Sequence, residues 1–397
     1  MKTGAIICEY NPLHNGHLYH IQETKKAGIT HLIALLSDDI VQRGDTALLH
    51  KFDRAALAIE AGADLVIELP VPYSCASAEF YARGAVQILH DLQILDMLSF
   101  GCSGKPDTLR KLAGLSLQLL TPDKIQNLLK TGCSYPAAVY QILSASLPPE
   151  TAGLLLDPNN LLAVEYLKAM QKQQVSFSSL MIQRNSVMHD SPEASGIFAS
   201  ASFIRKQFFH HETYQQYIPD FTAALLSERQ KQGRTADFYQ LEKIILYRMR
   251  MLSEQDFLSL PDMTPELAGR FRKAQKQNSL DDFLNTVKSR CFTMARIRRI
   301  LFYALAGIRK EDFQLSVPYA RILAFNQNGT EILKKLKSQS RIPVGTSLSS
   351  LRKLSPEAER FAELETNTAN LYGLAQKQIC SAESEFRMKI NLKNTKK

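Results

Sequence analysis

No apolar run in this 397-residue sequence approaches the roughly 20 residues that a helix needs to cross a bilayer. A Cys-x-x-Cys pair is also missing, and the cysteines are scattered at Cys8, Cys75, Cys102, Cys133, Cys291 and Cys380. Isolated cysteines of this kind are typical of reduced thiols. The first expected strand lies at residues 5–8, close to the start of the sequence, so no signal peptide is expected. These absences predict a cytoplasmic protein without a membrane segment.

Acidic residues are the minority among the charged ones. Asp and Glu total 39 against 48 Lys and Arg, which gives a formal net charge of +9 and a pI of about 9.1. This balance suits a polyanionic partner, although charge alone does not identify one.

A chain of this length has room for two or three domains. No motif indicates an obligate protein partner.

The stretch His14-Asn15-Gly16-His17 carries the strongest chemical signal. It follows an apolar run at residues 5–8, expected to be a buried strand, and precedes a helical pattern at 18–27. The N–H groups of a helix N-terminus favour anions, glycine lets a phosphate approach the backbone, and imidazoles donate to its oxygens. The motif resembles that of adenylyl- and cytidylyltransferases, where it stabilises the α-phosphate as pyrophosphate leaves. His14 and His17 are therefore the expected catalytic residues.

Two other interpretations of the histidines were weighed. They could form half of a zinc site, but no cysteine or third histidine lies at ligand spacing nearby. They could also be polar residues of an ordinary helix cap. A His-x-Gly-His pattern arises by chance in roughly one of a hundred sequences of this composition, and its place after the first strand makes accident rarer. The sequence favours nucleotidyl transfer.

Strand and helix patterns alternate along the first half of the chain. The expected elements after the motif lie at residues 30–36, 54–61, 63–69, 77–92, 97–100, 109–120, 122–129 and 175–182. This alternation predicts an α/β fold with a Rossmann-like parallel sheet and helices on both faces. Ligands of such sheets bind beyond the carboxyl ends of the strands, where the histidine motif, Ser37, Pro70 and Gly101 fall. The sequence predicts one shared pocket there.

A hydroxyl-rich helix start follows at residues 199–205. Ser200 and Ser202 can cap the helix or bind phosphate oxygens, and Arg205 adds fixed charge one turn later. Standing alone, the segment would be an ordinary capped helix. With the histidine motif upstream, it is expected to contact the β- and γ-phosphates of a nucleotide. Residues 1–208 then form a catalytic domain.

Residues 209–312 change in character and are expected to be a basic helical region. Its basic side chains are interleaved with aromatic ones, which suits RNA phosphates and unpaired bases. Any single cluster is more simply a solvated helix face. The candidate tRNA-binding residues are Arg248, Arg250, Lys288, Arg290, Arg296, Arg298 and Arg299. Residues 313–397 are expected to form a small C-terminal domain, with a strand at 319–325, a turn at 326–329 and a basic helix.

Five segments together resemble the tRNA(Met) cytidine acetate ligase family, in order and over nearly the whole chain. They are CEYNPLHNGH at 8–17, VQRG at 41–44, GADLVIELP at 62–70, PNN at 158–160 and PYARIL at 318–323. The resemblance implies that ATP and acetate form an acetyl-adenylate, and the chemistry of ATP suggests Mg²⁺ on the leaving pyrophosphate. The acetyl group would then pass to N4 of the wobble cytidine of elongator tRNA(Met).

The resemblance also implies which residues bind ATP. The first group surrounds the histidine motif and consists of Ile7, Cys8, Glu9, Tyr10, Asn11, Pro12, Leu13, His14, Asn15, Gly16, His17, Leu18, Tyr19 and His20. The second group is Gly101, Asn159, Asn160, Arg184, Ser200, Ser202 and Arg205, with either Asn159 or Asn160 contacting ATP.

Three positions depart from the family pattern. They are Asp38-Asp39 after the second strand, Cys102-Ser103-Gly104 after Gly101, and Ala201 in the hydroxyl-rich segment. Asp38 would point away from the pocket, help to hold Mg²⁺ or signal another carboxylate preference.

Two other functions also stay open: a small-molecule adenylyltransferase of cofactor synthesis, and a non-catalytic RNA-binding protein on the same scaffold.

Overall fold

The computed structural model describes residues 1–130, 133, 135–183, 196–388 and 390–392. Within this part of the chain, a central sheet has the strand order β10-β8-β5-β2-β1-β6-β7, and β9 pairs with β8. Its strands are β1 (Thr3–Cys8), β2 (His31–Ser37), β5 (Leu65–Leu69), β6 (Met97–Cys102), β7 (Ser178–Gln183), β8 (Ala320–Phe325), β9 (Val344–Gly345) and β10 (Asn391–Leu392). A separate hairpin consists of β3 (Ile40–Val41) and β4 (Asp45–Thr46).

The parallel part of the sheet confirms the expected Rossmann-like arrangement. Strands β5, β2, β1, β6 and β7 all run in the same direction. Because β1 lies between β2 and β6, the histidine motif that follows it emerges at the middle of the carboxyl edge. This edge is where ligands of such sheets bind.

Helices cover both faces of the sheet, as expected. Alternate residues of a strand point to opposite faces, and Ala5 packs in one hydrophobic cluster whereas Ile6 packs in another. The cluster of Ala5 includes side chains of α4 (Ala78–Asp91) and α9 (Pro158–Lys172). That of Ile6 includes side chains of α1 (Asn15–Lys26) and α2 (Lys51–Glu60). Burial of both faces explains the uninterrupted apolar strand sequences.

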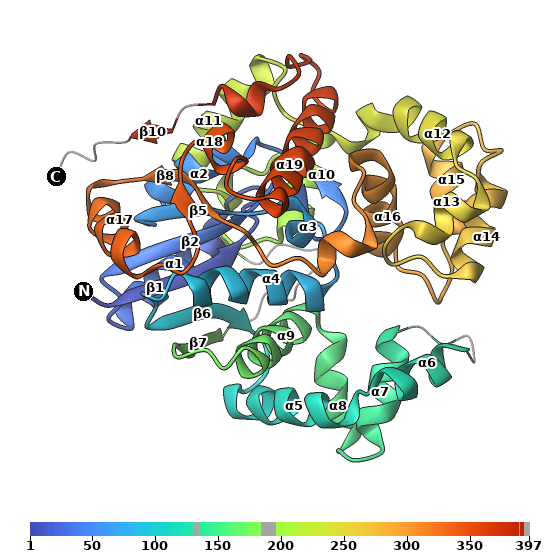
Figure 1. Cartoon of the computed structure of the whole chain (residues 1–397), viewed down its shortest axis with the longest axis horizontal. Helices are drawn as coiled ribbons and strands as arrows, with labels where there is room; N and C mark the ends of the chain where they lie inside the picture. The colour runs from blue at the N-terminus through green and yellow to red at the C-terminus, as the bar shows by residue number, and fades with distance from the viewer. Residues whose placement is uncertain (131–132, 134, 184–195, 389, 393–397) are drawn as a thin grey trace.

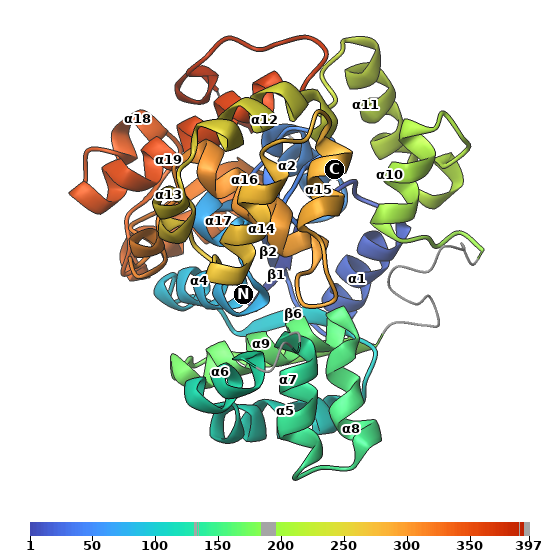
Figure 2. The same cartoon turned by 90° about the vertical axis from the view of Figure 1, so that its right-hand side faces the viewer.

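Two helical groups extend from this layered core (Figures 1 and 2). The first is the part of the chain that connects β6 to α9, and it consists of α5 (Pro106–Leu119), α6 (Pro122–Lys130), α7 (Tyr135–Ser144) and α8 (Pro149–Gly153). The second consists of α12 (Glu242–Met251), α13 (Glu254–Ser259), α14 (Pro265–Ala274), α15 (Leu280–Val287) and α16 (Met294–Ala306). It is preceded by α10 (Ala201–Phe209) and α11 (Asp220–Lys231), whose side chains pack in the same cluster as Ile6. None of the described helices combines the length and apolar character that crossing a membrane requires.

The C-terminal segment joins the central sheet, which corrects the expectation of a wholly parallel one. Strand β8 is hydrogen bonded to β5 in the antiparallel sense. The expected turn at 326–329 is also wrong, because Asn326 is the N-cap of α17 (Gln327–Gln339) and its side chain accepts from Gly329 N at 3.0 Å. The segment ends with α18 (Leu348–Leu351), α19 (Pro356–Leu374) and the short 3-10 helix η5 (Ser384–Phe386). The division into three domains stays a prediction.

A buried cluster of charged side chains, here called the charge cluster, joins this segment to the sheet. Lys51 Nζ lies 3.2 Å from Asp38, 2.5 Å from Glu68 and 2.7 Å from Glu385. Arg321 Nη1 also contacts Glu68 and Glu385, and lies 3.5 Å from Glu365. All six side chains are almost completely buried. Four carboxyl groups thus share two cations, so the cluster favours retention of protons by some of its acids.

Asp38→Asn is expected to change how stability depends on pH. Burial raises the pKa of the Asp38 carboxyl from 3.8 to about 7, aided by Glu68 and opposed by Lys51. The folded state therefore holds this proton more tightly, so the stabilisation is complete below about pH 3.8 and is lost as pH rises through 7. Relative to wild type, the variant should gain unfolding free energy between pH 5 and pH 8.

The measurement is the denaturation midpoint of both proteins at several pH values. Asp107→Asn on α5 is the matched control, since the Asp107 side chain is 92% exposed. A difference between Asp38→Asn and wild type that stays constant from pH 5 to pH 8 would contradict the assignment of this proton to Asp38.

Candidate active site

The histidine motif lies at the N-terminus of α1, as the sequence predicts. His14 is the N-cap, and its carbonyl oxygen accepts from the N–H groups of His17 and Leu18. The rings of His14 and His17 are stacked, with centroids 3.6 Å apart and planes inclined by 19°. A Cβ atom at Gly16 would lie 2.9 Å from Cε1 of His14. Glycine is therefore needed here by the imidazole ring itself, in addition to the space that it leaves for a phosphate.

The hydrogen bonding of His17 fixes which of its nitrogens can act as a donor. His17 Nδ1 accepts from the backbone N–H of His14 at 3.3 Å. A neutral imidazole has one donor and one acceptor nitrogen, so the proton of His17 resides on Nε2. This N–H group, together with backbone N–H groups at the N-terminus of α1, can donate to an oxyanion.

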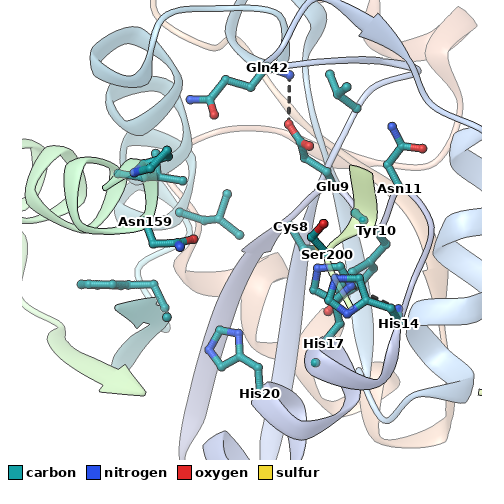
Figure 3. A pocket seen from close by; sticks show the side chains of 18 of the residues that line it. Cys8, Glu9, Tyr10, Asn11, His14, His17, His20, Gln42, Asn159 and Ser200 are labelled. Carbon is teal, nitrogen blue, oxygen red and sulfur yellow. Dashed lines mark hydrogen bonds between the residues drawn. The ribbon is translucent and has the colours of Figure 1, made fainter. Parts of the chain in front are cut away.

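A cavity of about 340 Å³ opens at this edge of the sheet and brings most of the expected site together (Figure 3). Expected residues that line it are Ile7, Cys8, Glu9, Tyr10, Asn11, His14, Gly16, His17, Tyr19, His20, Gly101, Asn159, Ser200, Ser202 and Arg205. Residues of the first strand end, α1, α9 and α10 thus surround one space. Arg184 lies outside the described residues.

Five expected residues do not line the cavity: Pro12, Leu13, Asn15, Leu18 and Asn160. Leu13 is fully buried in the core, and Asn15 Nδ2 donates to the carbonyl oxygens of Ile197 and Gln216. Asn160 Oδ1 accepts from Ser103 N at 2.9 Å and from Gly104 N at 2.8 Å, so it holds the loop after β6. The placement favours Asn159 as the asparagine that faces a nucleotide.

The hydroxyl-rich segment caps a helix, as expected, and its contact with phosphates stays a prediction. Ser200 is the N-cap of α10, where its Oγ accepts from Phe203 N at 3.2 Å and lies 3.0 Å from Ser202 Oγ. Arg205 Nη1 donates to the carbonyl oxygen of Asn11 at 2.8 Å. The helix start is therefore capped and also faces the histidine motif across the cavity. A second helix N-terminus beside the first suits a polyphosphate.

Several lining residues were missed from the sequence, namely Gln42, Arg43, Tyr81, Phe100, Leu162, Tyr166 and Phe198. Gln42 and Arg43 belong to the VQRG segment that carries part of the family resemblance, so a signal for them was present. The apolar and aromatic residues come from helices and strands far apart in sequence. The packing of α4 and α9 against the sheet brings Tyr81, Leu162 and Tyr166 to the cavity, whereas Phe198 comes from the segment before α10.

Asp38 and Asp39 are outside the set of residues that line the cavity. Both are fully buried, and their carboxylates face α2: Asp39 Oδ1 accepts from Lys51 N at 2.6 Å, and Asp38 belongs to the charge cluster. Of the three possibilities weighed for Asp38, the structure favours the one in which it points away. In the described part of the chain, no group of three or more His, Cys, Asp or Glu residues is arranged to hold a metal ion.

Comparison with known proteins agrees with this site. The family described as HIGH Nucleotidyl Transferase matches residues 1–386. The tRNA(Met) cytidine acetate ligase of Thermoanaerobacter sp. (strain X514) is 36% identical, over 96% of this chain and 97% of its own. The chain belongs to the tRNA(Met) cytidine acetate ligase family. The ligase of Alkaliphilus metalliredigens is 33% identical, over 97% of both chains.

Solved structures of this family have the same fold. Thermotoga maritima TmcAL bound with alpha-thio ATP has 26% identity and a TM-score of 0.87, and covers 97% of this chain and 98% of that one. The apo form of the same protein has a TM-score of 0.91, and covers 99% and 100%.

The basic residues expected to bind tRNA are placed in two ways in this member of the family. Arg248, Arg250, Lys288 and Arg290 are exposed. Arg296, Arg298 and Arg299 on α16 are at least half-buried and bonded within the chain. Arg299 Nη1 donates to the carbonyl oxygen of Gln42 at 3.3 Å, and its Nη2 lies 3.2 Å from Asp262. This placement favours a role for Arg299 in holding the cavity-lining residues of the β3–β4 hairpin.

Arg299→Met is therefore expected to lower acetate-dependent ATP–pyrophosphate exchange even without tRNA, by up to about 10²-fold, because Gln42 and Arg43 lose their support. The matched control is Arg296→Met on the same helix, since the described hydrogen bonds of the Arg296 guanidinium go to the Asp262 carbonyl and not to the hairpin. An RNA contact would instead raise the KM for tRNA and leave the exchange unchanged.

Proposed function

We propose that this chain activates acetate with ATP to an acetyl-adenylate and then acetylates N4 of the wobble cytidine of elongator tRNA(Met). Membership of the tRNA(Met) cytidine acetate ligase family supports the reaction. The supporting observation in the structure is that two helix N-termini, one with His14 and His17 and one with Ser200, line the same cavity. Such an arrangement suits a triphosphate that is to be split between its α- and β-phosphates.

In the first step, a carboxylate oxygen of acetate attacks the α-phosphorus in line and pyrophosphate leaves. His14 and His17 would donate to the phosphoryl oxygens on which charge develops, and Ser200, Ser202 and Arg205 would hold the leaving pyrophosphate. No protein nucleophile is needed. We further propose that ATP enters as its Mg²⁺ complex, with the cation carried by the phosphate oxygens of this substrate.

In the second step, the amino group of cytosine attacks the acyl carbon and AMP leaves. An exocyclic amine conjugated to its ring is a weak nucleophile, so a mixed anhydride is a suitable acyl donor. The wobble base is unpaired in the anticodon loop and can be turned into the cavity at little cost. The exposed residues Arg248, Arg250, Lys288 and Arg290 are the candidates for contacting the tRNA backbone. A tRNA substrate also supports a cytoplasmic location.

The test is nucleoside mass spectrometry on elongator tRNA(Met) incubated with the full chain, ATP, Mg²⁺ and acetate, omitting each small substrate in turn. N4-acetylcytidine that requires both ATP and acetate is the expected result. ATP turnover that needs neither acetate nor tRNA would instead support a small-molecule adenylyltransferase. Absence of any ATP turnover would support a non-catalytic RNA-binding protein.

A further inference from the structure

Glu9 places a carboxyl group in the cavity that the first step does not use. It is the residue directly after β1, and it is half-buried. Figure 3 shows its side chain between the histidine motif and Gln42. Its Oε1 accepts from the backbone N–H of Gln42 at 2.9 Å. The carboxyl group is thus held beside the residues that would surround the α-phosphate.

The main chain of Glu9 is held as firmly as its side chain. Arg54 is fully buried and its Nη1 donates to the carbonyl oxygen of Glu9 at 2.7 Å and to that of Ser37 at 2.9 Å. One guanidinium therefore ties the end of β1 to the end of β2. A carboxyl group fixed at both its main chain and its side chain is preorganised for one task.

The surroundings of Glu9 favour a proton acceptor. Burial raises the pKa of its carboxyl group above 4.5, whereas the Gln42 N–H and the charges of Arg43, Arg205 and Arg54 lower it. Other titratable groups close enough to interact with it are Cys8, Cys75, Tyr81 and Tyr166. A base whose pKa moves from its ordinary value towards neutral pH is more effective at proton transfer.

Only the second step of the proposed reaction releases a proton. Acetate attacks ATP as an anion, so forming the adenylate requires no base. The N4 amino group of cytosine, in contrast, becomes cationic as it bonds to the acyl carbon, and it must lose one proton to give the amide. A positioned base in the cavity therefore has a use in acyl transfer and none in adenylation.

We propose that Glu9 is the general base of acyl transfer. Its carboxylate accepts a proton from the cytosine N4 amino group as the nitrogen–carbon bond forms. The bond between the acyl carbon and the phosphate oxygen breaks, and AMP leaves with that electron pair. The protonated Glu9 then returns its proton to water. This inference rests on the function proposed above and adds a catalytic residue to it.

Glu9→Gln tests the inference, because the amide oxygen of glutamine can still accept from Gln42 N while the side chain no longer takes a proton. Three rates are measured on the full chain: acetate-dependent ATP–pyrophosphate exchange, acetyl transfer to tRNA(Met), and acetohydroxamate formation with hydroxylamine. Hydroxylamine is a strong nucleophile that needs little base assistance. Transfer to tRNA should fall by about 10²–10⁴-fold, which is at least tenfold further than either of the other two rates.

Two results would overturn the inference. If exchange and hydroxamate formation fell as far as tRNA acetylation, Glu9 would act in binding or adenylation. If tRNA acetylation fell by less than threefold, the proton of the N4 amino group would be accepted by AMP or water instead of Glu9. Glu9→Asp is the companion variant: a shorter carboxylate should restore part of the transfer that Glu9→Gln loses. The proposed function fails separately, if wild type itself forms no N4-acetylcytidine.

Discussion

His17→Ala is expected to lower acetate-dependent ATP–pyrophosphate exchange by about 10²–10³-fold, and His14→Ala should have an effect of similar size. The reason lies in the hydrogen bond from His14 N to His17 Nδ1, which directs the remaining proton of His17 to Nε2. Removing either imidazole takes a donor from the place where phosphoryl charge develops. The exchange assay needs no tRNA, so it isolates the adenylation step.

The control for the histidine variants is His210→Ala at the end of α10, an exposed residue outside the cavity. Circular dichroism and the denaturation midpoint should match wild type in all three variants. Near-normal exchange in either His14→Ala or His17→Ala would show that the motif has been assigned wrongly.

Arg321→Met is expected to destabilise the protein by about 3–5 kcal/mol. Arg321 Nη1 lies 3.3 Å from Glu68 and 3.5 Å from Glu365, and it also contacts Glu385. Without its guanidinium, three buried carboxyl groups would depend on Lys51 alone or would have to take up protons. Breaking a buried ionic group in this way costs far more than the intact group gains.

Guanidinium chloride unfolding, followed by circular dichroism, measures this change. Arg110→Met is the matched control, because Arg110 pairs with Asp107 on the surface of α5 at 3.1 Å. Exposed pairs contribute up to about 1 kcal/mol, so the control should shift the midpoint little. Equal shifts in the two variants would mean that the charge cluster is not a stabilising element.

Local patterns in the sequence were sufficient to predict the parallel strands and the histidine motif. Both depend on short-range features: apolar runs of strand length, and a helix start directly after a strand. The position of β8 beside β5 could not be predicted in this way, because the pairing joins residues far apart along the chain. Asp38 illustrates the same limit, since only the packing of α2 and η5 shows which way its carboxyl group points.

The site was predicted unevenly for a related reason. The residues around the motif could be named because of the family resemblance, and Ser200 and Arg205 also from their hydroxyl-rich segment. Arg299 stands in a sequence cluster that reads as a surface for RNA, yet its side chain is buried against Gln42 and Asp262. A run of arginines in a sequence shows that positive charge is present, but not which way each side chain points. Which of them reach solvent depends on the turn of α16 that packs on the hairpin.

The antiparallel strand β8 has a consequence for how the protein is made. Arg321 lies 253 positions after Glu68, so the charge cluster acquires its second cation only long after β5 has been synthesised. The nascent chain carries every histidine of the cavity early but lacks the neighbour of β5 until late. We expect the ribosome-bound N-terminal half to expose the edge of β5 to chaperones until β8 has been synthesised.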